Sequence, residues 1–356
     1  MSDLEDILKR TIRAEGPMTL ATYMATCLTH PQHGYYTTRD PLGAGGDFIT
    51  APEISQMFGE LIGLSLAQHW LDHGAPSPFT LAELGPGRGT LMADALRACR
   101  AVPGFLDAAE VHLVEVSPAL RAIQADALKG HNPTWHDGLA KLPDAPLYLI
   151  ANEYFDALPV RQFRRDAKGW AETMVGLDGD TLALGAAPPA PLAALDHRLD
   201  DTQRGDIVEL NAPATAEAQA IAQCIATHGG AALIIDYGDW RALGDTVQAL
   251  RNHETVDLLD APGTADLTAH VDFEPLAQAA VQAGAQHSRL TPQGFFLERL
   301  GITQRAQTLA RALTGDALES HIAAHRRLTH PAEMGTLFKC MSIHAPDTAP
   351  PPGLEP

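Results

Sequence analysis

The segment Glu83-Leu84-Gly85-Pro86-Gly87-Arg88-Gly89 combines an acidic side chain with three closely spaced glycines. It lies between an apolar run at 79–84 and a stretch with helical periodicity, so it is expected to form the turn from a strand into a helix. Glycines at such a turn let the backbone pass close to a ligand, which makes Gly85, Gly87 and Gly89 candidate binding residues. The alternative is a tight turn that serves packing alone.

The chemistry around this turn narrows the ligand class. The spacing Gly-x-Gly-x-Gly differs from that of dinucleotide sites, and the sequence has no Gly-Lys-Ser/Thr of a phosphate-binding loop here. The carboxylate of Glu83, two positions before Gly85, would repel a pyrophosphate but accept hydrogen bonds from an ammonium group or from hydroxyls. S-adenosylmethionine has no phosphate and carries an ammonium group, so it is the cofactor that we expect.

Three further positions fit a nucleoside cofactor. Glu115 ends the next apolar run, where α/β folds bind ribose hydroxyls; the alternative is a solvated carboxylate. Asp137 follows the third run and could accept a hydrogen bond from the adenine amino group, or simply begin a turn. Thr50 starts a helix whose N-terminus could bind the methionine carboxylate. The alternative for Thr50 is a capping box, in which Glu53 reaches back to the start of the helix.

A parallel sheet would bring these residues together. Short apolar runs alternate with helical stretches from residue 79 to about 152, and another run follows at 230–238, which indicates βαβ units. Further helices are expected at 4–12, 20–28 and 50–73, with a loop rich in Gly, Thr and Asp before the third. The last two strands are expected near 284–293 and 336–345.

We therefore expect three parts in the chain. Residues 1–75 form an N-terminal helical region that packs on the core, and residues 76–345 form the α/β domain. Residues 160–205 interrupt that domain with alternating polar and apolar residues, which predicts a β-hairpin insertion. The Pro-rich tail at 346–356 is expected to be disordered.

The composition limits the partners. The chain has 44 acidic and 25 basic residues and a net charge of −19, which disfavours binding to nucleic acid or to anionic membranes and suits a basic partner or a small ligand. Four widely spaced cysteines are typical of a reducing compartment. Because the sequence has neither a signal peptide nor an apolar stretch of ~18 residues, we expect a soluble, cytoplasmic protein without membrane insertion. The oligomeric state is not indicated.

Seven motifs, taken in order, make the sequence recognisable. They are GDFITAPEISQMFGELIG, ELGPGRGTLMADALR, VEVSPALR, ANEYFDALPVRQF, IDYG, DLTAHVDF and TPQGFFLERLGI. This series resembles the MidA-like family of S-adenosylmethionine-dependent methyltransferases, which is related to a mitochondrial complex I assembly factor that methylates arginine. The resemblance runs from about Leu4 to Ile343 and so covers nearly the whole chain.

The resemblance has implications for fold and substrate. It implies an α/β fold of the class I methyltransferase (Rossmann-like) type: a seven-stranded mixed sheet with helices on both faces and an antiparallel last strand. Here that fold would carry an N-terminal helical extension and a β-rich insertion. The resemblance also implies a protein substrate with an exposed arginine, namely the complex I subunit homologous to the 49-kDa subunit.

The segment Asn152-Glu153-Tyr154-Phe155-Asp156 follows the fourth predicted strand, at the edge where such sheets bind ligands. A guanidinium is a poor nucleophile because it stays protonated in water. Carboxylates can orient it, and a base must eventually take a proton. We therefore expect Glu153 and Asp156 to be catalytic and Asn152 to bind the cofactor. The alternative is a polar loop whose Asp caps the next turn.

His270 is a third catalytic candidate, because Asp266 and Asp272 flank it in the sequence. Neighbouring carboxylates could raise the pKa of the imidazole and make it a base, or His270 could organise a loop over the site. A metal site is disfavoured because no third or fourth ligand has a recognisable spacing, so we expect no metal. Asp236 and Tyr237 either border the same cleft or form a turn at a strand end.

Two other functions stay open at this point. One is a methyltransferase that acts on a small molecule. The other is an assembly chaperone that binds the cofactor without catalysis. The acidic net charge favours a basic protein substrate over a small molecule, since opposite charge steers association. The intact motifs at 83–89 and 152–156 favour an enzyme over a chaperone.

Overall fold

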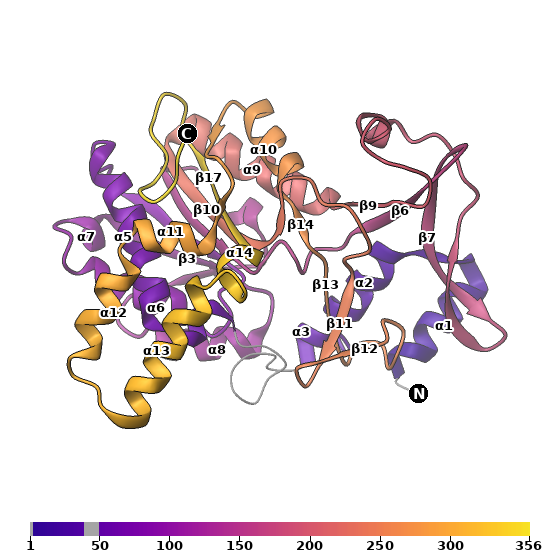
Figure 1. Ribbon diagram of the computed structural model, residues 1–356, viewed down its shortest axis with the longest axis horizontal. Coiled ribbons are helices and arrows are strands. Elements are labelled where there is room, and N and C mark those ends of the chain that lie inside the picture. The colour runs from indigo at the N-terminus through magenta and orange to yellow at the C-terminus, as the bar shows by residue number, and fades with distance from the viewer. Residues whose placement is uncertain (1–2, 39–49) are drawn as a thin grey trace.

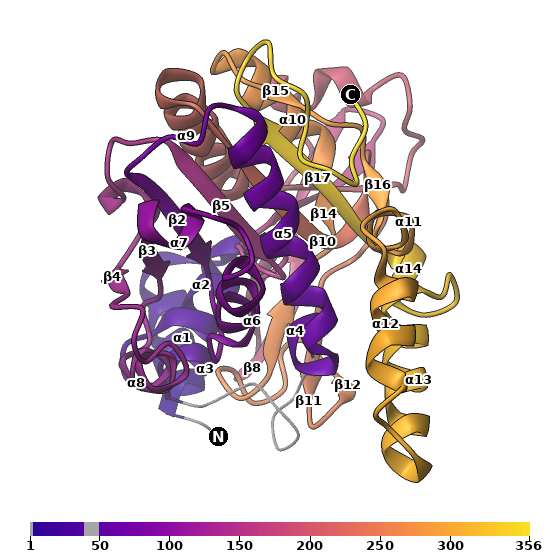
Figure 2. The ribbon, with the colours of Figure 1, turned by 90° about the vertical axis from the view of Figure 1, so that its left-hand side faces the viewer.

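The computed structural model of the chain describes residues 3–38 and 50–356. Its centre is a sheet in the order β15-β17-β10-β5-β2-β3-β4, with β14 beside β10 and β16 beside β17 (Figures 1 and 2). The strands are β2 (Phe79–Leu84), β3 (Ala109–Val114), β4 (Thr134–His136), β5 (Leu147–Asn152), β10 (Gly230–Asp239), β14 (Val271–Asp272), β15 (Gln286–His287), β16 (Thr291–Pro292) and β17 (Phe338–His344).

The strand directions confirm the predicted fold class. Strands β4, β3, β2, β5 and β10 run parallel, and β17 is antiparallel to β10. Among the described residues, the continuous row contains seven strands, as the class I methyltransferase fold requires. Because the parallel strands end at one edge of the sheet, their C-terminal residues gather there.

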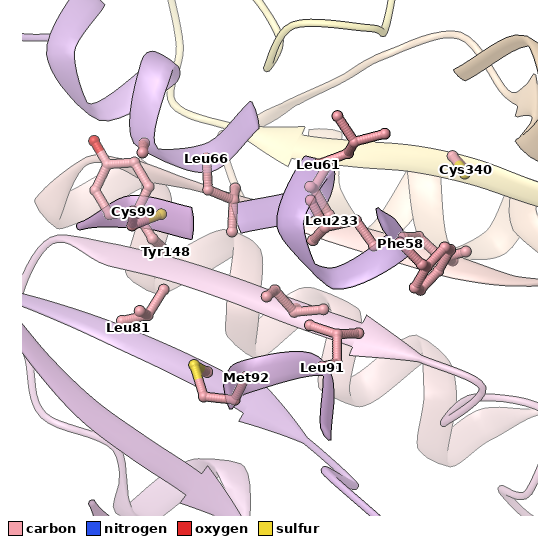
Figure 3. Packing of buried hydrophobic residues seen from close by; sticks show 14 of the residues in the cluster. Phe58, Leu61, Leu66, Leu81, Leu91, Met92, Cys99, Tyr148, Leu233 and Cys340 are labelled. Carbon is pink, nitrogen blue, oxygen red and sulfur yellow. The ribbon is translucent and has the colours of Figure 1, made fainter. Parts of the chain in front are cut away.

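Helices cover both faces of this sheet. α5 (Gln56–Asp72) and α6 (Thr90–Cys99) pack on one face, and α9 (Ala212–His228) and α10 (Phe273–Gln282) on the other. All six residues of β2 are buried, as expected for a central strand between two helical layers. Figure 3 shows the first layer, where Phe58 and Leu61 of α5 and Leu91 of α6 lie over the sheet. Three further short helices follow between β2 and β5 in the chain: α7 (Phe105–Ala108), α8 (Pro118–Ala127) and η1 (Leu139–Lys141).

The predicted insertion is larger than a hairpin. β6 (Arg161–Asp166), β7 (Gly169–Asp178), β8 (Thr181–Ala186) and β9 (Ile207–Leu210) form a second sheet with β1 (Met18–Thr19), and the short helix η2 (Ala193–Arg198) lies between β8 and β9. A third sheet, which the sequence did not predict, contains β11 (Gln248–Arg251), β12 (Glu254–Val256) and β13 (Asp266–Thr268). These strands make a lobe beside the central sheet (Figure 1).

The N-terminal helices belong to this lobe. α1 (Asp3–Glu15) and α2 (Leu20–Thr29) share a core with the second and third sheets, in which Leu8 and Tyr23 meet Val175 and Leu267. α3 (Tyr35–Thr38) follows α2. Only the later part of the predicted helical region, α5, packs on the central sheet. α1 and α2 are therefore part of the lobe, because their apolar faces pack against the strands of the insertion.

The predicted helix at 50–73 is interrupted. α4 (Ala51–Ile54) ends at Ser55, whose extended backbone starts α5 and whose Oγ accepts from the Met57 N–H at 3.3 Å. The predicted capping box is wrong, because the Thr50 side chain caps nothing and the Glu53 carboxylate instead accepts from the Thr90 hydroxyl at 2.5 Å. This contact joins α4 to the first turn of α6.

Four helices lie between β16 and β17 in the chain: α11 (Gln293–Arg299), α12 (Ile302–Ala310), α13 (Gly315–Thr329) and α14 (Met334–Leu337). α12 and α13 project beyond the rest of the molecule (Figure 2). The tail at 346–356 departs from the predicted disorder, because Leu354 is buried and the Ser65 hydroxyl donates to the Pro352 carbonyl at 2.8 Å. The tail therefore packs across α5.

Candidate active site

A cavity of about 490 Å³ opens at the carboxyl edge of the central sheet. Its volume lies within the range typical of small-molecule sites. Of the eleven residues predicted for the site, those that line this cavity are Thr50, Glu83, Gly85, Gly87, Glu115, Asp137, Asn152, Glu153 and Asp156. The parallel topology explains the convergence, since β2, β3, β4 and β5 all end here. Gly89 and His270 do not line the cavity.

The glycine turn has the backbone that its sequence predicts. Gly85, Gly87 and Gly89 have φ angles of 56°, 54° and 82°, a region that side-chain-bearing residues rarely adopt. A Cβ added to Gly85 would lie 2.9 Å from Cδ2 of Tyr154, so this position also needs glycine for space. Gly89 starts α6 and faces Gln124 instead of the cavity.

Glu83 is a buried carboxyl at the cavity wall. Its side chain is 3% exposed, and Oε2 has no hydrogen-bond partner among the described residues. Burial raises the pKa of Glu83 to about 8. A buried oxygen without a donor is costly, so this atom fits a cationic or hydrogen-bonding ligand group, as the ammonium of S-adenosylmethionine would be.

Glu115 is held by its own loop. Oε1 accepts from the Ser117 N–H at 2.7 Å, and Oε2 accepts from Nε2 of Gln124 at 3.2 Å. Burial raises the pKa of Glu115, opposed by these donors. A carboxylate oxygen has room for more than one donor, so the fixed carboxylate keeps acceptor capacity for ribose hydroxyls.

Asp137 is less suited to its predicted role. Its carboxylate pairs with Arg121 at 2.5 Å, and 86% of the side chain is exposed. Arg121 also donates through Nε to the Glu115 carbonyl at 2.7 Å. The structure thus places Asp137 at the cavity rim, in water and next to a cation.

Glu153 has an unusual backbone for a glutamate. Its φ of 49° lies in the left-handed region, and such strain persists mainly where surrounding contacts enforce it. Oε1 accepts from the Ala51 N–H at 3.1 Å and from Nδ2 of Asn152 at 3.2 Å. Burial raises the pKa of Glu153 to about 7, with a further rise from the negative charge of Asp156. Oδ1 of Asn152 is buried without a partner among the described residues.

Asp156 belongs to the same loop as Glu153, and Asp236 of β10 holds that loop by hydrogen bonds. Asp236 accepts from the backbone N–H groups of Phe155, Asp156 and Tyr237 at 2.9–3.2 Å, which fixes the shape of segment 153–156. Burial raises the pKa of Asp156 to about 6, opposed by a contact with Tyr237. Burial and the nearby charges of Asp156 and Glu153 raise the pKa of Asp236. The cavity therefore favours a cation, which would let these carboxyls ionise.

Sequence reasoning missed several wall residues. Tyr36 of α3 lines the cavity, and its hydroxyl donates to Oδ1 of Asp266 at 2.8 Å. Glu217 of α9 and Arg88 of the glycine turn also line it. Tyr36 stands in a predicted loop without periodicity, and Glu217 is a single acid in an alanine-rich helix. Neither has a local signal, since both reach the cavity through long-range packing.

His270 does not line the cavity and lies next to Tyr237, which does. Its ring packs edge-on against Tyr237 with centroids 5.3 Å apart, and its backbone N–H donates to the Thr246 hydroxyl at 2.9 Å. Burial lowers the pKa of His270, so the prediction of a raised pKa is wrong. The flanking Asp272 faces the buried Arg198 at 3.8 Å and not the cavity.

Within the described residues, no three His, Cys, Asp or Glu side chains are arranged to hold a metal ion. No helix in the same ranges is long and apolar enough to cross a membrane. Residues 46–49, at the start of the first recognised motif, lie outside the described residues, as does most of the predicted loop before Thr50.

The comparisons with known proteins decide the family. Residues 61–291 match a family described as "Putative S-adenosyl-L-methionine-dependent methyltransferase". The chain belongs to this methyltransferase family. The match covers the glycine turn, Glu115 and the 152–156 loop, so the methyltransferase uses S-adenosylmethionine as its cofactor.

Curated relatives resemble this methyltransferase over nearly its whole length, beyond the matched residues 61–291. It is 38% identical to "Protein arginine methyltransferase NDUFAF7, mitochondrial" of Danio rerio, over 94% of this chain and 85% of the relative. It is 37% identical to the Homo sapiens protein of the same name, over 93% of this chain and 81% of the relative. The predicted cytoplasmic location is contradicted by these relatives, because they are named as mitochondrial proteins.

A solved structure supports the identity of the cofactor. A likely methyl transferase from Burkholderia thailandensis, crystallised with S-adenosyl-homocysteine, has a TM-score of 0.83 to this methyltransferase at 29% identity. The superposition covers 96% of this chain and 91% of that one. The two proteins therefore share the whole architecture, insertion lobe included.

Proposed function

We propose that this methyltransferase acts on an arginine side chain of a protein. The observation that carries the proposal is the pair of buried carboxyls, Glu153 and Asp156, in the wall of the cofactor cavity. Relatives at 37–38% identity are named protein arginine methyltransferases, which supports the same substrate class.

The chain's own residues suggest how the cofactor is held. Glu83 would accept from the ammonium group and Glu115 from the ribose hydroxyls, while the glycine turn lets the backbone approach. The unpartnered Oδ1 of Asn152 lies on the same wall. When bound, the cofactor supplies a methyl group on a positively charged sulfur. The protein's task is then mainly alignment of the accepting nitrogen.

The two carboxyls suit a guanidinium in particular. A planar guanidinium can donate two parallel hydrogen bonds to one carboxylate, which orients one nitrogen and holds the other. Because Glu153 and Asp156 have pKa values of about 7 and 6, each is partly protonated near neutral pH before a cation arrives. An arriving guanidinium would lower both pKa values and release these protons. Glu153 is then the candidate acceptor for the proton that the methylated nitrogen must lose.

The substrate that the family resemblance implies is the complex I subunit homologous to the 49-kDa subunit, and we propose it as the first candidate. The net charge of −19 supports a basic partner, because opposite charge raises the association rate at low salt.

Mass spectrometry of that subunit tests the proposal. The purified subunit is incubated with the methyltransferase and S-adenosylmethionine carrying a labelled methyl group, and its peptides are then mapped. The proposal predicts label on arginine. Label on lysine, or turnover only with a small-molecule acceptor, would contradict it.

A further inference from the structure

One half-buried glutamate in the cavity wall has no role among the residues described above. Glu217 lies in the first half of α9 and lines the cavity. Its Oε2 atom is buried and has no hydrogen-bond partner among the described residues. Because leaving a buried carboxylate oxygen without a donor costs free energy, this atom indicates a donor that a ligand supplies.

Tyr154 fixes the orientation of Glu217. The Tyr154 hydroxyl donates to Oε1 of Glu217 at 3.1 Å, so Oε2 is the oxygen left for a ligand. The Tyr154 ring lies against the glycine turn, where a Cβ on Gly85 would approach Cδ2 to 2.9 Å. The Tyr154–Glu217 pair therefore stands beside the turn that binds the cofactor.

The neighbours of this pair indicate which cofactor group it faces. Tyr154 and Glu217 line the same cavity as Glu115, and the pKa of Tyr154 is raised by burial, by Glu217 and also by the negative charge of Glu115. The ribose hydroxyls suit Glu115, and the ammonium suits Glu83. The remaining strong donor of the nucleoside half is the adenine amino group. Asp137, predicted for that group, is exposed and paired with Arg121.

We propose that Oε2 of Glu217 accepts a hydrogen bond from the adenine amino group of the cofactor, and that Tyr154 is the positioning residue that holds the carboxylate. Glu217 then selects adenine over purines without the amino group. This inference concerns cofactor recognition, and it goes beyond the proposed arginine substrate without depending on it.

Calorimetric titration with two ligands tests the inference. One ligand is S-adenosylhomocysteine, and the other is its analogue whose purine lacks the 6-amino group. The unmodified protein should bind the amino compound roughly tenfold to a hundredfold more tightly, as for a hydrogen bond to a charged group. Glu217→Ala should lose this preference, because only the amino compound loses a contact. Gln223→Ala, an exposed change on the same helix, should keep it.

Two further variants keep the test sharp. Tyr154→Phe should reduce the preference partly, since it frees the carboxylate without removing it. If Glu217→Ala melts without ligand, Glu217→Leu replaces it and should also lose the preference, because a leucine side chain has no hydrogen-bond acceptor. A full preference in a folded Glu217 variant would overturn the inference. Failure of arginine methylation would leave all these binding results unchanged, so the two proposals fail separately.

Discussion

The Ala51 N–H donates to Oε1 of Glu153 at 3.1 Å, although 102 positions separate the two residues in the sequence. Through this bond the start of α4 holds a glutamate whose φ of 49° is unfavourable. Asp236 holds the rest of the loop by accepting from the backbone N–H groups of Phe155 and Asp156. The loop that carries the proposed catalytic carboxyls is therefore fixed from two sides before any ligand binds.

Replacing Glu83 should separate stability from binding. The pKa of Glu83 rises from 4.5 to about 8 in the fold, so the folded state binds more protons than the unfolded state between these values. The stabilisation from the neutral carboxyl is thus complete below about pH 4.5 and is lost as pH rises through 8. Glu83→Gln should flatten this fall in the free energy of unfolding and weaken cofactor binding.

Urea unfolding at pH 5 and pH 8.5 measures the first effect, and calorimetry measures the second. Glu15→Gln, an exposed change in α1, is the matched control and should leave both unchanged. If Glu83→Gln retained the cofactor affinity of the unmodified protein, Glu83 would not face the ammonium group.

Gly85→Ala should impair the cofactor site more than its backbone strain explains. The added Cβ meets a φ of 56° and the Tyr154 ring at 2.9 Å, so the ring must shift. Gly104→Ala has a comparable φ of 79°, but its nearest neighbour is Trp70 at 3.7 Å, outside the cavity. Both variants should lose about 1–2 kcal/mol of stability. In titrations with S-adenosylhomocysteine only Gly85→Ala should bind weakly, and equal affinities would remove the glycine turn from the site.

Glu115→Ala should weaken S-adenosylmethionine binding by about 1.5–3 kcal/mol, the value of hydrogen bonds to a charged group. The carboxylate is already fixed by Ser117 and Gln124, so it needs no reorganisation to accept ribose hydroxyls. Glu110→Ala, an exposed change on the strand that precedes Glu115, is the control. A titration in which both variants bind like the unmodified protein would mean that Glu115 serves its loop alone.

His270→Phe tests the remaining catalytic prediction. The ring packs on Tyr237 and does not line the cavity, so a phenyl ring should preserve that contact. Methyl transfer should then stay close to that of the unmodified protein. A loss of roughly 10²-fold in the single-turnover rate, the scale of a general base, would restore His270 to the mechanism.

The central strands could be predicted because their apolar character is local. β2 is a run of buried residues between turn signals, and the topology rules then bring its end beside those of β3 and β5. β11 and β12 could not be predicted in the same way, since short mixed sequences such as Gln248–Arg251 become strands only through pairing with β13.

The same distinction holds for the site. Glu83 lies near the end of β2, and Glu115 and Glu153 directly follow β3 and β5, so their positions indicate a shared edge of the sheet. Tyr36 lies on α3, which packs against the lobe, and Glu217 lies on α9. Each side chain lines the cavity only because its helix packs beside the sheet. The spacing of residues in the sequence does not predict how these helices pack. The local sequences of Asp137 and His270 indicated roles in the site. In the structure Asp137 forms an ion pair with Arg121, and the His270 ring packs against Tyr237.

The most direct test of the proposed chemistry is single-turnover methyl transfer by Glu153→Gln at saturating S-adenosylmethionine. The amide keeps the shape of the side chain but cannot accept a two-pronged guanidinium, because one of its prongs is a donor. With the candidate complex I subunit as acceptor, cofactor affinity should stay near that of the unmodified protein while the rate falls by roughly 10²-fold or more. Glu254→Gln, an exposed change, should retain the full rate. Full activity in Glu153→Gln would contradict the role of this carboxyl in holding the arginine.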